Sequence, residues 1–353
     1  MRTSDFDYVL PPELIAQTPI EPRDASRLLV AQRSTGELAH RQFRDIGDYL
    51  RPGDLLVANR SRVIPARLRG YKPDTGGAVE ALLLASHPEL GPGCWEALVR
   101  PGRRIREGQE LRFEAAQPDG QTAALTAAVI ARTESGGRVL RFAPPATGEA
   151  VETLLGRLGS MPLPPYIHTP LENAERYQTV YSREPGSAAA PTAGLHFTPE
   201  LLERLREQGV ETAFVLLHVG LDTFRPVEEE DPGEHKMHSE AIELDEATAA
   251  QINAARARGG RVVAVGTTSV RVLESLPETD PVLPFQGRTS LFITPGHQFK
   301  LVDAMITNFH LPRSSLLMLV SAFAGSELIR RAYEEAVARR YRFFSFGDAM
   351  LLL

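Results

Sequence analysis

Three of the nine histidines stand where a side chain could transfer protons to or from a bound molecule. His196 follows the turn in "AAPTAGLHFT", His218 ends the apolar run "LLHVG", and His310 lies in "TNFHLP". Histidine is the side chain best suited to acid–base catalysis near neutral pH, so all three are candidate catalytic residues. The alternative, strongest for His218, is a hydrogen-bonded histidine in the core of the protein.

The turn before His196 contains small and flexible residues. Thr198 can cap a helix whose first turn begins with Pro199, which explains the end of this stretch but not His196. We expect Gly194 to let the backbone approach a ligand closely, because glycine has no side chain in the way. Thr192 in the same turn is a candidate substrate-binding residue, as is Asn308 in "TNFHLP".

The segment "VGTTSVR" follows a predicted buried strand. Ligands of open α/β sheets bind beyond the carboxyl ends of the strands, which is where Gly266 turns the chain. Thr267, Thr268 and Ser269 come just before a short predicted helix, whose backbone N–H groups and hydroxyls could bind a carboxylate or a phosphate. The alternative is a helix cap without a ligand. The segment lacks the lysine and second glycine of a P-loop.

A metal site is weakly indicated. His235 and His238 in "HKMHSE" are three residues apart, with Glu240 beyond them, but the proline and glycine just upstream predict a loop rather than a helix that would align them. Cys94 is the only cysteine, which excludes a disulfide framework and cysteine-rich metal centres. The chain also lacks H-E-x-x-H, G-x-S-x-G and G-x-G-x-x-G motifs. We therefore expect no metal and no dinucleotide cofactor.

The charge is unevenly distributed, although the net charge of −6 argues against a protein that coats nucleic acid. Residues 60–72 hold five basic side chains and no acid, and "RPGRRIR" adds four arginines. These runs permit a polyanionic partner, and the alternative is a solvated surface in a chain with only three lysines. The candidate contacts to such a partner are Arg60, Arg62, Arg100, Arg103 and Arg104.

The pattern of apolar residues predicts two domains, as the length of 353 residues also suggests. Short alternating segments between 78 and 142 predict a small all-β barrel. After residue 190, helical and buried-strand patterns alternate, which predicts an α/β domain with a mixed, largely parallel sheet and flanking helices. We expect the α/β domain to span 1–60 and 150–353, and the β-barrel to be an insertion over 61–149. We also expect residues 330–344 to form a helix that leads into a strand.

Nothing in the sequence predicts a role at a membrane. The first twenty residues contain acids and prolines where a signal peptide needs an apolar core. The most apolar later run, "LLMLVSAFAG", is about half the length that spans a bilayer. Together with the single cysteine, these features predict a cytoplasmic protein.

The chain closely resembles the S-adenosylmethionine:tRNA ribosyltransferase-isomerases of queuosine biosynthesis. The matching stretches run in order over nearly the full length: "RPGDLLVANRSRVIPARL", "MPLPPYI", "YQTVYS", "AAPTAGLHFT", "FVLLHVGLDTFRPV", "MHSE", "VVAVGTTSVRVLES", "LFITPG", "DAMITNFHLPRSSLLMLVSAFAG" and "YRFFSFGDAMLL". Asp222 in "VGLDTF" departs from the pattern, which has glycine there. The resemblance implies an α/β domain with an inserted β-barrel.

The resemblance also implies a reaction. The ribosyl part of S-adenosylmethionine is transferred to 7-aminomethyl-7-deazaguanine at the wobble position of a tRNA, giving epoxyqueuosine and releasing adenine and methionine. The sulfonium acidifies the C5′ protons of the ribose, so the enzyme needs a base and an anchor for the methionine carboxylate, but no metal or redox cofactor. Among the histidines we favour His196 as the base. Thr267 and Thr268 are the expected anchor, and the arginines above are the expected tRNA contacts.

Two alternatives remain at this stage. One is an S-adenosylmethionine-dependent RNA methyltransferase, which is disfavoured because no glycine-rich methyltransferase loop follows an N-terminal strand. The other is a non-catalytic RNA-binding protein that uses the basic face of the barrel.

Overall fold

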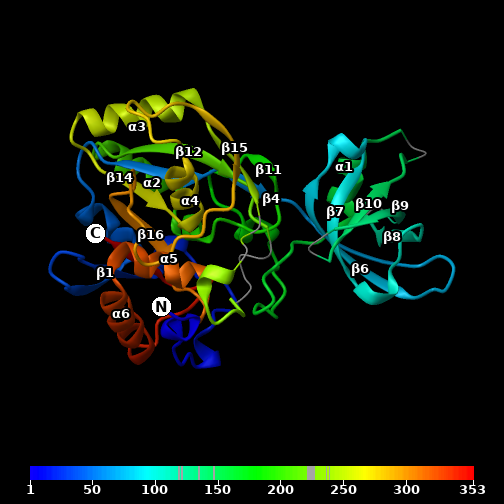
Figure 1. Ribbon diagram of the computed structural model, residues 1–353, viewed down its shortest axis with the longest axis horizontal. Helices are drawn as coiled ribbons and strands as arrows, with labels where there is room; N and C mark the ends of the chain where they lie inside the picture. Colours follow the sequence, from blue (N-terminus) through cyan, green and yellow to red (C-terminus); the bar gives the residue numbers. More distant parts are fainter. Residues whose placement is uncertain are drawn as a thin grey trace. The chain divides into compact units, whose positions relative to one another are not determined.

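The computed structural model describes residues 1–117, 120, 122–133, 136–145, 148–220, 227–235, 237 and 239–353. Asp222 and His238, both singled out in the sequence, lie outside the described residues. The chain divides into two compact units (Figure 1). The larger unit comprises Met1–Ser61, Pro164–Glu184 and Ala190–Leu353, and the smaller one comprises Arg62–Leu163 and Pro185–Ala189.

The larger unit is built on a mixed sheet that has nine strands within the described residues. In spatial order these are β15 (Phe285–Thr289), β13 (Glu240–Leu244), β12 (Glu211–Leu217), β3 (Leu55–Asn59), β14 (Val262–Val265), β16 (Ala304–Asn308), β17 (Ala349–Leu352), β1 (Arg27–Ala31) and β2 (Leu38–Gln42). The central strands β12, β3, β14 and β16 are parallel, as are β17 and β1. The other neighbouring pairs are antiparallel.

The central strands are apolar on both faces because helices and loops cover both. All residues of β3, β14 and β16 are buried, which is typical of parallel strands inside an α/β layer. Alternate residues of five strands contribute to one shared core beneath α2, as the period of two in a strand requires. These residues are Leu28, Val30, Leu56, Ala58, Val263, Val265, Ala304, Ile306, Ala349 and Leu351.

Helices follow the strands in the order that the sequence predicts. They are α2 (Pro199–Glu207), α3 (Glu246–Ala257), α4 (Thr267–Ser275), α5 (Ser315–Ala324) and α6 (Ser326–Ala338). The predicted cap at Thr198 is confirmed, since its hydroxyl accepts from the N–H of Leu201 at 3.1 Å. Asp245 caps α3 in the same way, because its carboxylate accepts from the N–H of Thr248 at 2.8 Å. Figure 1 shows α3 and α4 beside β12 and β14.

Short 3₁₀ helices make much of the remaining chain. Their bounds are η1 (Thr3–Phe6), η2 (Pro12–Leu14), η3 (Arg23–Ala25), η4 (Phe43–Tyr49), η5 (Pro88–Leu90), η6 (Gly102–Arg104), η7 (Ala174–Tyr177), η8 (Thr192–His196) and η10 (Pro232–Glu234). The C-terminal expectation was wrong in its bounds, because α6 ends at Ala338 and β17 begins only at Ala349. A turn between them contains Phe344 at a φ of 69°, which neither a helix nor a strand accommodates.

The smaller unit is a closed antiparallel barrel in the order β10, β7, β6, β5, β8 and β9. Its strands are β5 (Arg67–Tyr71), β6 (Ala78–Ser86), β7 (Cys94–Arg100), β8 (Glu110–Ala116), β9 (Thr122–Arg132) and β10 (Arg138–Phe142). The strand β5 was not predicted, because its arginines obscure an alternation in which Leu68 is fully buried. Two short strands, β4 (Ser61–Val63) and β11 (Glu184–Ser187), pair where the chain passes between the units.

The barrel unit extends past the boundary at residue 149 that the sequence suggests. Helix α1 (Val151–Leu158) belongs to this unit, because Leu154, Leu155 and Leu158 are buried in the barrel core. The predicted fold class is confirmed, since an α/β unit with a mixed sheet carries an inserted β-barrel. Among the described residues, no helix is both long and apolar enough to cross a membrane.

Candidate active site

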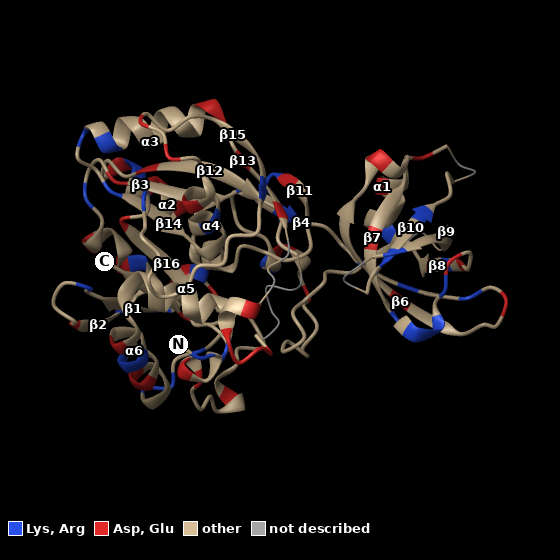
Figure 2. Ribbon diagram, viewed as in Figure 1, with Lys and Arg blue, Asp and Glu red and all other residues tan. Residues whose placement is uncertain are grey.

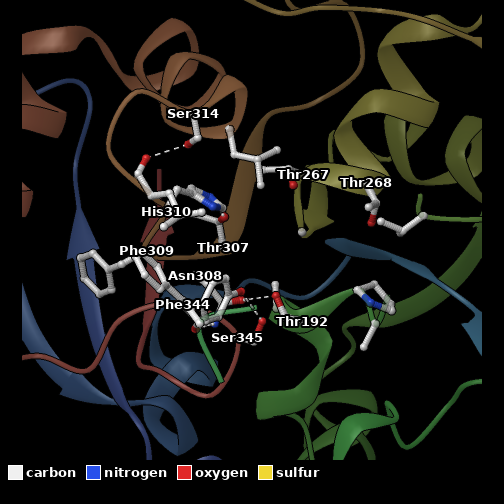
Figure 3. Close-up of a pocket in the computed structure, with 18 residues that line it drawn as sticks. Thr192, Thr267, Thr268, Thr307, Asn308, Phe309, His310, Ser314, Phe344 and Ser345 are labelled. Atoms are coloured by element: carbon white, nitrogen blue, oxygen red, sulfur yellow. Dashed lines mark hydrogen bonds between the residues drawn. The ribbon is translucent and has the colours of Figure 1, made fainter. Parts of the chain in front are cut away.

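A pocket opens in the larger unit beyond the carboxyl ends of β14 and β16 (Figure 3). It contains about 620 Å³ of space, part of which is open solvent. Its lining comes from η8, the start of α4, the segment after β16 and the turn before β17. Of the candidate residues from the sequence, the pocket brings together Thr192, Gly266, Thr267, Thr268, Asn308 and His310.

The start of α4 offers free hydrogen-bond donors to this pocket. Gly266 occupies the cap position at a φ of 86°, which favours glycine, and no side chain caps the helix. Among the described residues, no carbonyl accepts from the N–H of Thr267 or Thr268. The Thr268 hydroxyl is buried and has no hydrogen-bond partner within the part of the chain that the structure describes. These groups and the positive end of the helix dipole favour an anion at this end of the pocket.

His310 is the candidate histidine that lines the pocket. Its Nε2 is 2.7 Å from the Thr307 hydroxyl, while its backbone N–H donates to Tyr333 and its carbonyl accepts from Tyr8. The described residues provide no hydrogen-bond partner for Nδ1. Burial lowers the pKa of His310 to about 3, so the ring is neutral near pH 7. Figure 3 shows its ring beside Thr307 at the edge of the pocket.

His196 is placed differently from the expectation of a histidine open to ligand. It is 4% exposed, does not line this pocket, and stacks on Phe43. Its Nδ1 lies 2.7 Å from the Ser26 hydroxyl, and its Nε2 lies 3.1 Å from Asn308 Nδ2. Burial, together with the positive charges of Arg342 and Arg23, lowers the pKa of His196 to about 3.

Asn308 determines the tautomer of His196. The Phe344 carbonyl can only accept, so the Asn308 atom 3.1 Å from it must be the amide nitrogen. This nitrogen therefore also donates to His196 Nε2, which leaves the proton of His196 on Nδ1. The Asn308 oxygen accepts from Thr192 at 3.1 Å. His196 thus serves as a buried hydrogen-bond acceptor that fixes Asn308 between two walls of the pocket.

Three further candidates from the sequence do not line the pocket: His218, Ser269 and Gly194. His218 follows β12 and is half-buried, and burial lowers its pKa although Glu184 and Glu243 oppose the shift. Ser269 bonds to the Val265 carbonyl at 2.9 Å inside the helix. Gly194 is explained by packing, because a Cβ there would overlap the Tyr181 hydroxyl.

Comparison with known proteins gives matches over the whole chain. A sequence model of the family described as queuosine biosynthesis protein matches residues 3–352. The chain belongs to this family. Proteins named S-adenosylmethionine:tRNA ribosyltransferase-isomerase are 61% identical in Symbiobacterium thermophilum and 57% identical in Moorella thermoacetica, each over 100% of both chains. A crystal structure of S-adenosylmethionine tRNA ribosyltransferase from Thermotoga maritima is 44% identical, with a TM-score of 0.55, over 99% of this chain and 100% of that one.

In this member of the queuosine biosynthesis family, basic and acidic residues are spread over both units (Figure 2), and the candidate arginines differ in their ion pairs. Arg60 forms ion pairs with Glu243 at 2.7 Å and Asp245 at 2.8 Å, so its charge is already neutralised. Arg62 is partly buried in β4. By contrast, three barrel arginines are exposed and form no ion pair with any described residue: Arg100, Arg103 and Arg104.

No group of three or more His, Cys, Asp or Glu side chains that could hold a metal ion is found among the described residues, and His238 of "HKMHSE" lies outside them. His235 pairs with Glu229 at 2.9 Å. Glu240 forms a buried ion pair with Arg271 and accepts from the N–H of Gly220.

Sequence reasoning missed part of the pocket wall of this family member. Tyr166 donates or accepts a 2.7 Å hydrogen bond with Ser345, and both line the pocket together with Phe344. Tyr166 comes from the proline-rich stretch, which carries no periodic signal, and the other two lie in the turn that was expected to be a strand. Thr307 was also missed, although a polar residue at the end of an apolar strand was a usable signal.

Proposed function

We propose that this chain is an S-adenosylmethionine:tRNA ribosyltransferase-isomerase. It transfers and isomerises the ribosyl moiety of S-adenosylmethionine onto 7-aminomethyl-7-deazaguanine at the wobble position of tRNA, with release of adenine and methionine. Full-length membership of the family and the names of relatives at 52–61% identity support this reaction. The structural observation that carries it is the pocket in which an uncapped helix start and an unprotonated histidine face the same space.

S-adenosylmethionine occupies this pocket in our proposal. Its methionine carboxylate is the anion for which the N–H groups and hydroxyls of Thr267 and Thr268 are arranged. Such hydrogen bonds to a charged group are worth about 1.5–3 kcal/mol each, enough to fix which end of the substrate lies at α4. Thr192 and Asn308, which are joined to each other, form the opposite wall.

His310, rather than His196, is the base that our proposal assigns to the C5′ proton. Both ring nitrogens of His196 are already hydrogen-bonded inside the core, whereas Nδ1 of His310 is not. The sulfonium acidifies C5′, and the proton moves to Nδ1 while the Thr307 hydroxyl holds the ring through Nε2. General-base catalysis of this kind is typically worth about 10²–10⁴ in rate.

The tRNA contacts in our proposal include the barrel arginines Arg100, Arg103 and Arg104. Exposed arginines without carboxylate partners are suited to phosphates, which they bind through their forked donors. We no longer propose Arg60 for this role, because two carboxylates already occupy its guanidinium. S-adenosylmethionine is the only co-substrate in this proposal, with no metal, and the expected location is the cytoplasm.

The products distinguish this reaction from methyl transfer. The purified protein, incubated with S-adenosylmethionine and tRNA that carries the 7-aminomethyl-7-deazaguanine base, should release adenine and methionine in amounts equal to the modified tRNA. Liquid chromatography with mass detection measures all three. Release of S-adenosylhomocysteine would identify a methyltransferase instead, and unchanged S-adenosylmethionine with bound tRNA would favour the non-catalytic alternative.

A further inference from the structure

A second, smaller cavity lies in the larger unit on the other side of the turn that contains Ser345. It holds about 260 Å³ of space, part of which is open solvent, and is smaller than the pocket at the start of α4. Ser345 and His196 line it, and Ser345 also lines the substrate pocket. A chain of nucleotides with one base in the larger pocket could therefore place a neighbouring group in this cavity.

The charged residues that line this cavity are both arginines. Arg23 comes from η3 and Arg176 from η7, two short helices that pack against η8. Burial, and then the positive charge of Arg176, lower the pKa of Arg23, which means that the two guanidinium groups disfavour each other's charge. His196 adds no charge, because its ring is neutral.

Both guanidinium groups are held in place mainly by backbone carbonyls. Arg23 donates to the carbonyls of Gln178 at 2.7 Å and Glu175 at 3.0 Å, and Arg176 donates to the carbonyl of Ile20 at 2.7 Å. A carbonyl fixes an arginine without cancelling its charge. Donors remain for a ligand, since the described residues provide no partner for Nε of Arg23 or for Nε and Nη1 of Arg176.

Two carboxylates offset part of this charge from outside the cavity. Glu21 lies 3.1 Å from Arg176 Nη2, but its side chain is 75% exposed. Glu175 raises the pKa of Arg23 at longer range. Neither carboxylate lines the cavity, so its interior presents only positive charge.

We propose that this cavity binds a phosphodiester group of the tRNA backbone next to the nucleotide that is modified. The proposal rests on the proposed function. Two arginines with fixed forks and spare donors suit the tetrahedral oxygens of a phosphate. The cavity lies against the wall of the substrate pocket through Ser345, so a phosphate bound there would position the base beside S-adenosylmethionine.

The first test compares Arg176→Gln with the unmutated protein in titrations of an anticodon stem–loop RNA at several salt concentrations. Losing one phosphate contact should weaken binding about tenfold and reduce the slope of log Kd against log salt by about 0.7. The affinity for S-adenosylmethionine should stay within about twofold, because no donor at α4 changes. Arg206→Gln is the matched control, since this exposed arginine pairs with Glu203 and its loss should leave the slope unchanged. An unchanged slope in Arg176→Gln would overturn the proposal.

Arg176→Lys separates charge from shape. Lysine keeps the charge but loses the fork and the bond to Ile20, so the salt slope should be retained while affinity falls. If Arg176→Lys instead loses the slope as Arg176→Gln does, local misfolding rather than phosphate binding explains both variants, and the proposal fails.

The second test identifies the phosphate. Stem–loops with one neutral methylphosphonate linkage at a time are titrated against the unmutated protein and Arg176→Gln. At one linkage the methylphosphonate should raise the Kd of the unmutated protein about tenfold and leave the Kd of Arg176→Gln almost unchanged. Equal costs in both proteins at every linkage would contradict the proposal while leaving the proposed function intact. The proposed function itself fails if the unmutated protein binds S-adenosylmethionine but none of the stem–loops, including the one in which every linkage is a normal phosphodiester.

Discussion

Replacing His196 by glutamine or by leucine tests whether this residue is a hydrogen-bond acceptor rather than a base. Glutamine can place a carboxamide oxygen near the position of Nε2 and accept from Asn308, whereas leucine has a similar bulk and no acceptor. The contact to be kept or lost is the 3.1 Å hydrogen bond from Asn308 Nδ2. His310→Gln is the companion variant in the substrate pocket.

The expected magnitudes follow from the buried contacts of His196. His196→Leu leaves one N–H of the Asn308 amide and the Ser26 hydroxyl unpaired in a site where the histidine is 4% exposed, and each unmet buried group costs about 1–3 kcal/mol. We therefore expect the free energy of unfolding to fall by roughly 2–5 kcal/mol. His196→Gln leaves only Ser26 unpaired, so its loss should be about 1–2 kcal/mol.

Turnover should depend on His310 and hardly on His196. His196→Gln should retain kcat within about threefold, because no reacting atom contacts this ring, while His310→Gln should lower kcat by about 10²–10⁴ with little loss of stability. Urea unfolding gives the free energies, and adenine release under saturating substrates gives kcat. The reasoning is refuted if His196→Gln is as stable as the unmutated protein but turns over a hundredfold more slowly.

Three further predictions concern other parts of the molecule. Thr268→Val removes a buried hydroxyl that has no hydrogen-bond partner among the described residues. The unfolding free energy of the free protein should therefore rise by about 1 kcal/mol, while the Kd for S-adenosylmethionine rises about tenfold. Unchanged affinity in calorimetry would return Thr268 to a purely structural role. Stability should fall below pH 6.5, because His196 and His310 have folded pKa values of about 3 against 6.5 unfolded, so protons favour the unfolded chain between these values. Between pH 7 and pH 5 the free energy of unfolding should fall by about 2 kcal/mol for each histidine. Urea unfolding of His196→Gln should show about half of the total fall, and a pH dependence equal to that of the unmutated protein would contradict this. Arg103→Glu combined with Arg104→Glu should flatten the salt slope of tRNA binding by about 1.4. The same reversal at Arg330 and Arg339, which pair with glutamates of α6, should leave the slope unchanged, and equal slopes in the two double variants would place the tRNA elsewhere.

The fold was largely predictable because its signals are local. Period-two patterns indicated five of the barrel strands, and caps at Thr198 and Asp245 set the starts of two helices. Strand β5 and the turn after α6 were not predictable in this way. In β5 the alternating arginines obscure the buried Leu68, and the turn depends on Phe344 at positive φ, which tertiary contacts and not local preference stabilise.

The sequence indicated which residues line the candidate pocket, but the roles of these residues stay predictions. Thr267, Thr268 and His310 follow the carboxyl ends of β14 and β16, and they come together there as the geometry of an α/β sheet requires. Sequence alone could not distinguish His310 from His196, because both stand beside a turn that contains proline or glycine. The difference comes from Ser26 and Asn308, which are distant in the chain and bind both nitrogens of His196. The same holds for Arg60, whose carboxylate partners are more than 180 residues away in sequence.

The most direct measurement of the central claim follows labelled S-adenosylmethionine into tRNA. One sample carries the label in the ribose and another carries it in the methyl group, and each is incubated with the purified protein and tRNA that contains 7-aminomethyl-7-deazaguanine. The proposed reaction transfers the ribose label to the tRNA and leaves the methyl label in free methionine. Methyl label in the tRNA, or neither label in tRNA that the protein binds, would contradict the assignment of this chain as a ribosyltransferase-isomerase.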